Sequence, residues 1–263
     1  MIEPGLVSVT FRKLHPSEIV ALAARTGLSV IEWGGDIHVP HGQVGRAREV
    51  RRMTLEAGLR VASYGSYYTL GSRKGPAFEA VVDTALALGA PVIRVWAGER
   101  GSAEADDAYR HLVADDSHRT AELAGAAGLV TAFEFHHGTL TDTAASAREL
   151  LERVNHPAAR TYWQPATELD GSSNEAGLGL ILSWLVNVHV YQIHANGQER
   201  LPLSDGAEPW SHYLSMLAVN GRPHYAMLEF VRDDSPDAFV EDAADLRRWV
   251  AAANTSRMAP EDL

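Results

Sequence analysis

The sequence contains no cysteine, only two lysines and no long uninterrupted run of apolar residues. Without cysteine there can be no disulfide bonds, thiolate catalysis or cysteine-based zinc sites, so any metal must be bound by histidine, carboxylate or amide oxygen. This absence also favours a reducing compartment. No stretch approaches the roughly eighteen apolar residues of a membrane-spanning helix, and the N-terminus does not resemble a secretory leader. We therefore expect a cytoplasmic protein with no membrane partner.

Basic residues are scarce relative to acidic ones, with 23 lysines and arginines against 34 aspartates and glutamates, a net charge of −11. Such a surface repels a phosphate backbone, so we expect no nucleic-acid partner. The 263 residues are 46% hydrophobic, which is ample for a large buried core. No linker or low-complexity segment divides the chain. We expect one domain over residues 1–253 and a polar C-terminal tail at 254–263.

Short apolar or β-branched runs recur along the whole chain. They span residues 6–11, 29–33, 60–64, 91–96, 130–135, 160–164, 186–193 and 225–230. Because these runs lack strict alternation of polar and apolar residues, they are typical of strands covered on both faces, as in parallel sheets.

Helical patterns separate these runs, and several end at a glycine placed just before the next run. Two shorter helical patterns lie at 175–183 and 208–219, and the last spans 235–254. Eight strands alternating with eight helices over about 250 residues predict an α/β protein, a single (β/α)8 TIM barrel. A doubly wound parallel sheet is the alternative.

In such a barrel, catalytic groups come from the C-terminal ends of the strands and the loops that follow. Polar and aromatic side chains gather at these predicted ends, including six of the twelve histidines. The six are His38, His41, His136, His137, His189 and His194. Other polar and aromatic residues at these ends are Glu32, Tyr64 and Trp96 in the first half of the chain, and Trp163 and Arg232 in the second.

The last four strand ends carry Glu134, Gln164, His189 and Glu229, each inside or next to an apolar run. An unpaired charge buried there would be very unfavourable, and a shared divalent cation would resolve that cost. Two carboxylates, one imidazole and one amide oxygen suit Mn²⁺, Mg²⁺ or Co²⁺, and Zn²⁺ is also compatible. Taken singly, a strand glutamate is more often paired with an arginine, and a buried histidine with a backbone carbonyl.

At these residues the sequence resembles the xylose isomerase-like TIM barrel superfamily, often labelled sugar phosphate isomerase/epimerase. The resemblance covers nearly the whole chain. It runs through "IEWGGDIHVPHG", "SYGSYYTLG", "FEFHHGTLTDT", "NVHVYQIH" and "LEFVRDDSPDAF". These motifs keep their order and stand at predicted strand ends.

The resemblance implies a metal site. In the ketose 3-epimerase and isomerase branches, Glu, Asp, His and Glu from strands five to eight bind the metal, and these positions fall on Glu134, Gln164, His189 and Glu229. Gln164 departs from the pattern, and its neutral amide should lower the affinity because one negative charge is missing. Mn²⁺ is the expected metal. If the seventh strand differs in length, His189 and His194 exchange roles.

The resemblance also implies an activity, that of a divalent-metal-dependent sugar isomerase or epimerase acting through an enediolate. Glu134 and Glu229 would then serve as the acid/base pair as well as ligands. The expected substrate contacts are His38, His41, Tyr64, Trp96, His136, Trp163, His194 and Arg232. Each tryptophan has an alternative interpretation as barrel packing. The expected partner is a small sugar or sugar derivative, and a homo-oligomer is compatible with the sequence.

Three other functions remain open. A metal-assisted lyase or dehydratase would use the same enolate to expel a leaving group from a keto-sugar or related polyol, including C-glycoside cleavage. An endonuclease IV-like phosphodiesterase shares the barrel but requires, on strand six, an Asp followed three residues later by His, and "QPAT" has neither. A non-catalytic sugar-binding barrel would have lost its metal through Gln164.

Overall fold

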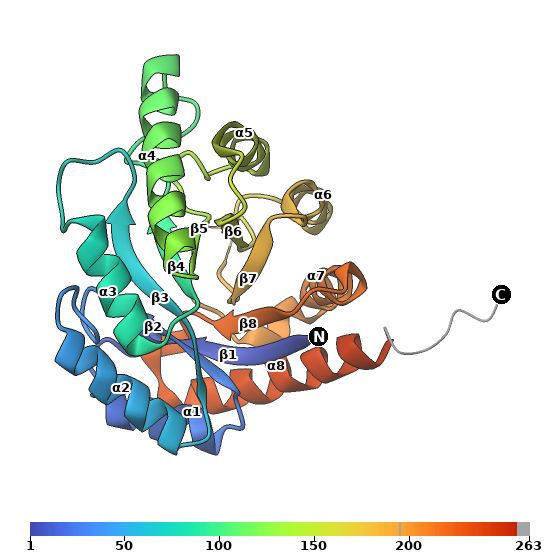
Figure 1. Ribbon diagram of the computed structural model, residues 1–263. Helices are drawn as coiled ribbons and strands as arrows, with labels where there is room; N and C mark the ends of the chain where they lie inside the picture. The colour runs from blue at the N-terminus through green and yellow to red at the C-terminus, as the bar shows by residue number, and fades with distance from the viewer. Residues whose placement is uncertain (195, 257–263) are drawn as a thin grey trace.

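In the computed structural model, which describes residues 1–194 and 196–256, eight parallel strands hydrogen-bond in chain order and close into a barrel (Figure 1). The strands are β1 (Ile2–Val7), β2 (Val30–Gly34), β3 (Arg60–Thr69), β4 (Val92–Trp96), β5 (Val130–Phe133), β6 (Ala159–Trp163), β7 (Leu185–Val190) and β8 (His224–Leu228). The (β/α)8 TIM barrel predicted from the sequence is therefore confirmed, and the doubly wound sheet is excluded.

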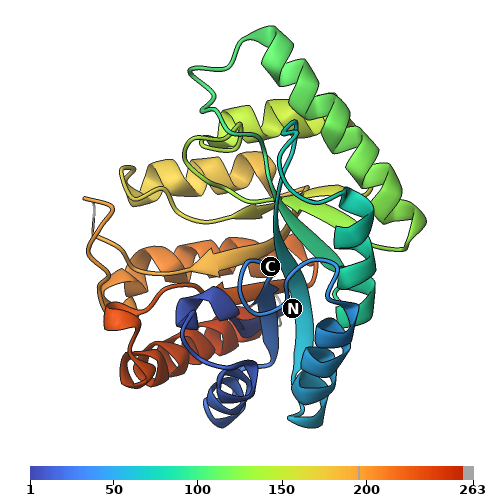
Figure 2. The same ribbon diagram turned by 90° about the vertical axis from the view of Figure 1, so that its left-hand side faces the viewer.

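Helices follow the strands and form the outer layer of the molecule (Figure 2). They are α1 (Pro16–Arg25), α2 (Val44–Glu56), α3 (Phe78–Leu88), α4 (Asp107–Ala126), α5 (Ala144–Val154), α6 (Gly171–Ile181), α7 (Ala207–Asn220) and α8 (Pro236–Ser256). Helix α1 begins as its sequence predicts, with Pro16 in its first turn, and His15 and Glu18 exchange the reciprocal hydrogen bonds of a capping box.

The first strand differs from the prediction. The sequence pattern places it at 6–11, whereas β1 spans Ile2–Val7 and a 3₁₀ turn occupies Ser8–Phe11. Proline and glycine disfavour strands, yet here Gly5 is required by close packing. A Cβ atom on Gly5 would lie 2.5 Å from Cγ2 of Val30. The barrel therefore overrides local propensity at this position.

Other boundaries move by a few residues. Strand β3 extends beyond the predicted 60–64 and contains a register shift between Gly65 and Tyr68, where Tyr67 adopts a positive φ of 55°. Strand β7 ends at Val190, before the predicted 193. Helix α8 continues to Ser256, so the first residues of the predicted tail are helical, and 257–263 lie outside the described residues.

The barrel has two apolar cores. The larger one lies between strands and helices, and the smaller one fills the barrel interior with Val7, Val30, Ala62, Ala132, Tyr162 and Met227 among others. Above this inner core, the interior side chains become polar toward the C-terminal ends of the strands, because Ala132 and Met227 are each followed two residues later by a glutamate. Within the described residues, no helix is long and apolar enough to cross a membrane.

Candidate metal centre and active-site pocket

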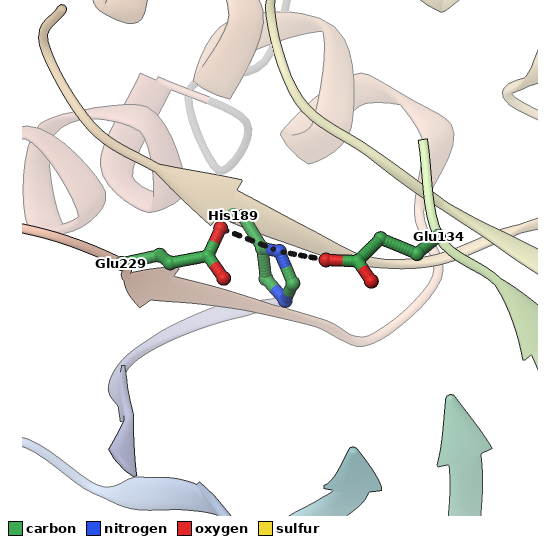
Figure 3. A group of neighbouring side chains, drawn as sticks. All are labelled: Glu134, His189 and Glu229. Carbon is green, nitrogen blue, oxygen red and sulfur yellow. Dashed lines mark ion pairs between the residues drawn. The ribbon is translucent and has the colours of Figure 1, made fainter. Parts of the chain in front are cut away.

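Three acidic and basic side chains meet at the mouth of the barrel. Glu134 follows β5, His189 lies in β7 and Glu229 follows β8, and all three are at most 5% exposed. One potential ligand atom from each lies within 4.8 Å of the others. Figure 3 shows the two glutamates reaching toward His189 from opposite sides. Nδ1 of His189 lies 3.0 Å from Glu229 Oε2 and 3.6 Å from Glu134 Oε1.

Gln164, which follows β6, points at the same place. Its Oε1 lies 3.1 Å from Nδ1 of His189. Alternation from the inward-facing Tyr162 turns Gln164 inward as well, so its position follows from the strand pleat. The structure thus brings together the four residues that the sequence predicts as metal ligands, with His189 rather than His194 as the strand-seven histidine.

A buried arginine lies directly beneath this cluster. Arg94, in the middle of β4, is 2% exposed, and its Nε donates to Glu32 Oε1 at 2.7 Å. Its Nη1 donates to Glu134 Oε2, and the indole N–H of Trp96 donates to the same oxygen. Glu134 therefore has one oxygen occupied by two donors, while the other faces His189.

Arg94 is absent from the site residues predicted from the sequence, and Glu32 is named there without a role. Both occupy the central position of a five-residue buried strand, in "VIEWG" and "VIRVW". Opposite charges at equivalent places in two apolar strands are a signal that they pair inside the barrel, since neither could be buried alone.

These charges set the protonation of the site. Burial alone would raise the pKa of Glu32, but the Arg94 guanidinium and His189 hold it well below its ordinary value. Burial would lower the pKa of His189, but Glu229 and Glu32 raise it to about 9. The pKa of Glu229 is likewise lowered, because His189 outweighs burial.

The donor set fits a divalent cation. Glu32, Glu134 and Glu229 carry three negative charges and Arg94 one positive charge. When His189 gives up its extra proton to bind a cation, a net charge of −2 remains, which one divalent ion would balance. Carboxylate and amide oxygens with one imidazole are typical ligands of Mn²⁺ and Mg²⁺. The buried Glu134, His189 and Glu229 group can thus bind a metal.

A pocket of about 480 Å³ opens above the cluster. Trp96 and His136 form one wall, with their rings stacked 4.9 Å apart, and His137 stacks on His136 at 4.5 Å. Tyr67 and Phe230 also line it, and both have left-handed backbone, with φ of 55° and 60°. Such strain in bulky residues is concentrated at functional sites in proteins.

Two of the eight expected substrate contacts, Trp96 and His136, line this pocket, and six do not. His38 and Tyr64 are buried, where Nδ1 of His38 lies 3.0 Å from Ser8 Oγ and the Tyr64 hydroxyl donates to the Val39 carbonyl. The half-buried His41 contacts the Tyr64 hydroxyl. Apart from Nε2 of His38, which has no hydrogen-bond partner among the described residues, these polar groups bond to one another or to nearby backbone, and none of them lines the pocket.

The remaining three expected contacts also lie away from the pocket. Trp163 is buried in the outer core, where its ring packs edge-on against Trp210 and Tyr213. His194 is exposed and accepts a hydrogen bond from the backbone of its own turn. The Arg232 guanidinium is half-exposed and lies 4.0 Å from Asp233. We do not propose these residues as substrate contacts.

The family model described as "Xylose isomerase-like TIM barrel" matches residues 20–251. The chain belongs to this family. A search of curated proteins gave no match.

Several solved structures are similar to this family member. The probable 3-DHS dehydratase AsbF of Bacillus anthracis has a TM-score of 0.78 at 20% identity, covering 94% of this chain and 99% of its own. A xylose isomerase-like protein from Mycobacterium smegmatis in complex with magnesium has 0.73 at 15%, covering 96% and 98%. An L-ribulose 3-epimerase has 0.69 at 16%, covering both chains fully. At these identities the likeness establishes the fold alone.

Proposed function

We propose that the protein is a divalent-metal-dependent isomerase or epimerase of a sugar or sugar derivative, with Glu134 and Glu229 as its acid/base pair. The observation that carries this proposal is the placement of the two glutamates on opposite sides of one buried donor cluster, at the floor of a pocket (Figure 3). Removing a proton from one face of a carbon and returning it on the other requires two such groups.

The metal would be held by Glu134, Gln164, His189 and Glu229. When bound, a divalent cation supplies Lewis-acid stabilisation of the negative charge that develops when the C–H beside a carbonyl is deprotonated. We expect Mn²⁺ to serve best, with Mg²⁺ next and Co²⁺ or Zn²⁺ as alternatives. The magnesium complex of the Mycobacterium smegmatis relative supports a metal in this fold.

The other residues bind and orient. Arg94 and Trp96 hold one oxygen of Glu134, leaving the second oxygen to accept and return a proton. The stacked rings of Trp96 and His136 offer a flat wall for the apolar face of a sugar. Nδ1 of His136 lies 2.7 Å from the His137 carbonyl, so the ring is fixed and its Nε2 is left to meet a hydroxyl.

The proposal is tested by incubating a panel of ketoses and aldoses with Mn²⁺-loaded protein in deuterated solvent. We expect one substrate to gain solvent deuterium at carbon while its skeleton stays intact. Glu134→Gln and Glu229→Gln should each lower kcat by about 10²–10⁴-fold, the usual contribution of an acid/base group. Retained turnover in either variant would sink the two-glutamate mechanism.

Metal content provides an independent test. Purified protein dialysed against Mn²⁺ should bind about one equivalent, and both glutamine variants should lose it. A wild-type protein that binds sugar but no metal would instead be a non-catalytic binding barrel. Circular dichroism must show that each variant keeps the wild-type fold.

A second candidate is a lyase that eliminates a group β to the carbonyl. It is favoured by the likeness to the AsbF dehydratase and by Arg12. The guanidinium of Arg12 pairs with Asp36, yet it is half-exposed and lines the pocket, where a carboxylate-bearing substrate could also meet it. Here Glu229 would remove the proton and His136 would protonate the leaving group. An unsaturated product in the deuterium experiment would establish this reaction over epimerisation.

A further inference from the structure

Glu32 lies at the centre of a buried polar network that the proposed reaction does not use. Its side chain is fully buried, and one oxygen accepts from Arg94 while the other accepts from the hydroxyls of Ser63 and Tyr162, all at 2.7 Å. Asn187 donates to the same Tyr162 hydroxyl at 3.1 Å. Every donor that reaches Glu32 is therefore fixed by the barrel wall.

The backbone also makes room for this network. A Cβ atom on Gly65 would lie 2.7 Å from Nη2 of Arg94 and 3.1 Å from Oε1 of Glu32. Only glycine leaves that space free in β3. The ion pair is thus accommodated by the strand beside it, as expected of a built arrangement rather than a chance contact.

The imidazole of His189 connects this network to the metal cluster above it. Its Nδ1 faces Gln164 and Glu229, whereas its Nε2 is buried, lies 3.6 Å from Glu32 Oε1 and has no hydrogen-bond partner among the described residues. The Tyr162 ring packs edge-on against it with centroids 5.0 Å apart. The ring is therefore held in one orientation.

In that orientation, Nδ1 and Nε2 of His189 have different roles. A neutral imidazole carries a proton on one nitrogen and a lone pair on the other. If Nδ1 offers its lone pair to a cation among Glu134, Gln164 and Glu229, the proton must reside on Nε2, which faces Glu32 Oε1 at 3.6 Å. Metal-binding histidines commonly donate their second N–H to such a carboxylate.

We propose that Glu32 and Arg94 are positioning residues of the metal centre, an inference that rests on the proposed metal-dependent function. Glu32 selects the His189 tautomer that presents Nδ1 to the cation. Arg94 holds Glu32 in place and engages Oε2 of Glu134, so that Oε1 faces the cluster. Glu32 does not line the pocket, and Arg94, which does, acts through its ion pairs with Glu32 and Glu134.

The first test is Mn²⁺ affinity measured by calorimetry on the metal-free full chain. Glu32→Gln should weaken binding 10–100-fold, the usual effect of losing a carboxylate behind a metal-binding histidine. The matched control is Glu3→Gln, which removes the partly exposed ion pair with Arg60 at the other end of the barrel and should leave the affinity unchanged. Wild-type affinity in folded Glu32→Gln protein overturns the inference.

A second variant separates positioning from net charge. Glu32→Gln leaves Arg94 without its partner, and that uncompensated positive charge would itself repel a cation. The double variant Glu32→Gln/Arg94→Met removes both charges. We expect its affinity to stay at least tenfold below wild type, and full recovery would overturn the positioning role.

Tyr162→Phe is a milder variant for the case that the charge substitutions prevent folding. It deletes one hydrogen-bond donor to Glu32 without changing any charge. We expect Mn²⁺ binding to weaken severalfold. In Mg²⁺-loaded wild-type protein, long-range ¹H–¹⁵N spectra should place the His189 proton on Nε2, and a proton on Nδ1 would overturn the inference. Wild-type protein that binds no metal defeats the proposed function itself, whereas binding that these substitutions leave unchanged defeats only the inference.

Discussion

Two groups of polar side chains at the barrel mouth differ in whether they line the pocket. The first-half group consists of Ser8, His38, His41 and Tyr64. The second-half group consists of Glu134, Gln164, His189 and Glu229. Members of the first group form hydrogen bonds with one another or with nearby backbone, and none of them lines the pocket. Members of the second group converge on one point, and three of the four, all but His189, line the pocket.

The two groups differ in the balance of hydrogen-bond donors and acceptors that they contain. Hydroxyls and neutral imidazoles both donate and accept, so a small group of them can satisfy itself and pack as part of the core. Carboxylates and an amide oxygen that face each other are all acceptors, so burying them together is very unfavourable unless donors or a cation lie between them. Histidine belongs to both groups, so a histidine count alone does not locate an active site.

The largest expected effect concerns the neutral member of the second-half group. Gln164→Glu replaces an amide with a carboxylate of the same length, 3.1 Å from His189 Nδ1 in the wild-type arrangement. We expect Mn²⁺ affinity to rise at least tenfold, because a charge about 4 Å from a cation contributes several kcal/mol even at a moderate effective dielectric constant.

Calorimetry with Mn²⁺ measures this change. Gln43→Asp, which adds the same charge at an exposed position before α2, is the control and should bind as wild type does. Unchanged affinity in Gln164→Glu would show that this residue is not a ligand, and the second-half group would shrink to three.

The next effect concerns Trp96, which lines the pocket from the first half of the barrel. Trp96→Phe keeps a ring to stack on His136 but loses the N–H that donates to Glu134. A hydrogen bond to a charged group contributes roughly 1.5–3 kcal/mol, so kcat should fall by about tenfold or more. Trp184→Phe, at the opposite end of the barrel before β7, should leave kcat unchanged. Equal kcat values in the two variants would count against a role for the indole N–H.

Substitutions in the first-half group should lower the free energy of unfolding and leave kcat nearly unchanged. His38→Ala removes a buried ring that contacts Ser8, and unfolding in urea should show a loss of roughly 1–3 kcal/mol. The kcat should remain within about twofold of wild type. His111→Ala, at an exposed site on α4, should change neither property. A large fall in kcat for His38→Ala would break the distinction between the groups.

The smallest effect lies outside both groups, in the buried Asp242 of α8. Burial raises its pKa to about 6, only partly offset by the Leu203 N–H at 2.9 Å. Because this folded-state pKa exceeds the unfolded value of about 3.9, its contribution to stability is full below about pH 4 and is lost as pH rises through 6. Asp242→Asn should therefore stabilise the protein at pH 8 by roughly 1–2 kcal/mol and not at pH 4. Thermal unfolding at both pH values measures the difference, and an equal effect at both would exclude titration of Asp242.

The sequence predicts the barrel and the convergence of four side chains at its strand ends, because both depend on local signals. Strand runs and helix caps are local signals, and the pleat then determines which residues face inward. Once Glu134 is placed after its strand, its direction follows from Ala132. The same alternation brings Gln164 inward from a neighbouring strand.

Pairing across the barrel is not a local property, and there the sequence predicts less. The residues next to Arg94 do not identify its partner, and the pairing is indicated only when its strand is compared with that of Glu32, 62 residues away. His38 and Tyr64 stand at strand ends as active-site residues do, and only the packed structure shows that His38 Nδ1 meets Ser8 and the Tyr64 hydroxyl donates to Val39, away from the pocket. Gly5 illustrates the same limit, because the close approach of Val30 is invisible in its local sequence.

The first strand and the last helix of the barrel are linked by a side-chain amide. Asn254, near the end of α8, accepts a hydrogen bond from the Ile2 N–H and donates one to the Ile2 carbonyl, at 2.9 and 2.8 Å, while β1 pairs with β8 from Ile2 onward (Figure 1). On a translating ribosome, β1 must therefore wait for nearly the whole chain, roughly ten seconds or more at ordinary elongation rates. Its edge is an unpaired strand for that time, and chaperone capture of nascent chains should be strongest before Asn254 emerges.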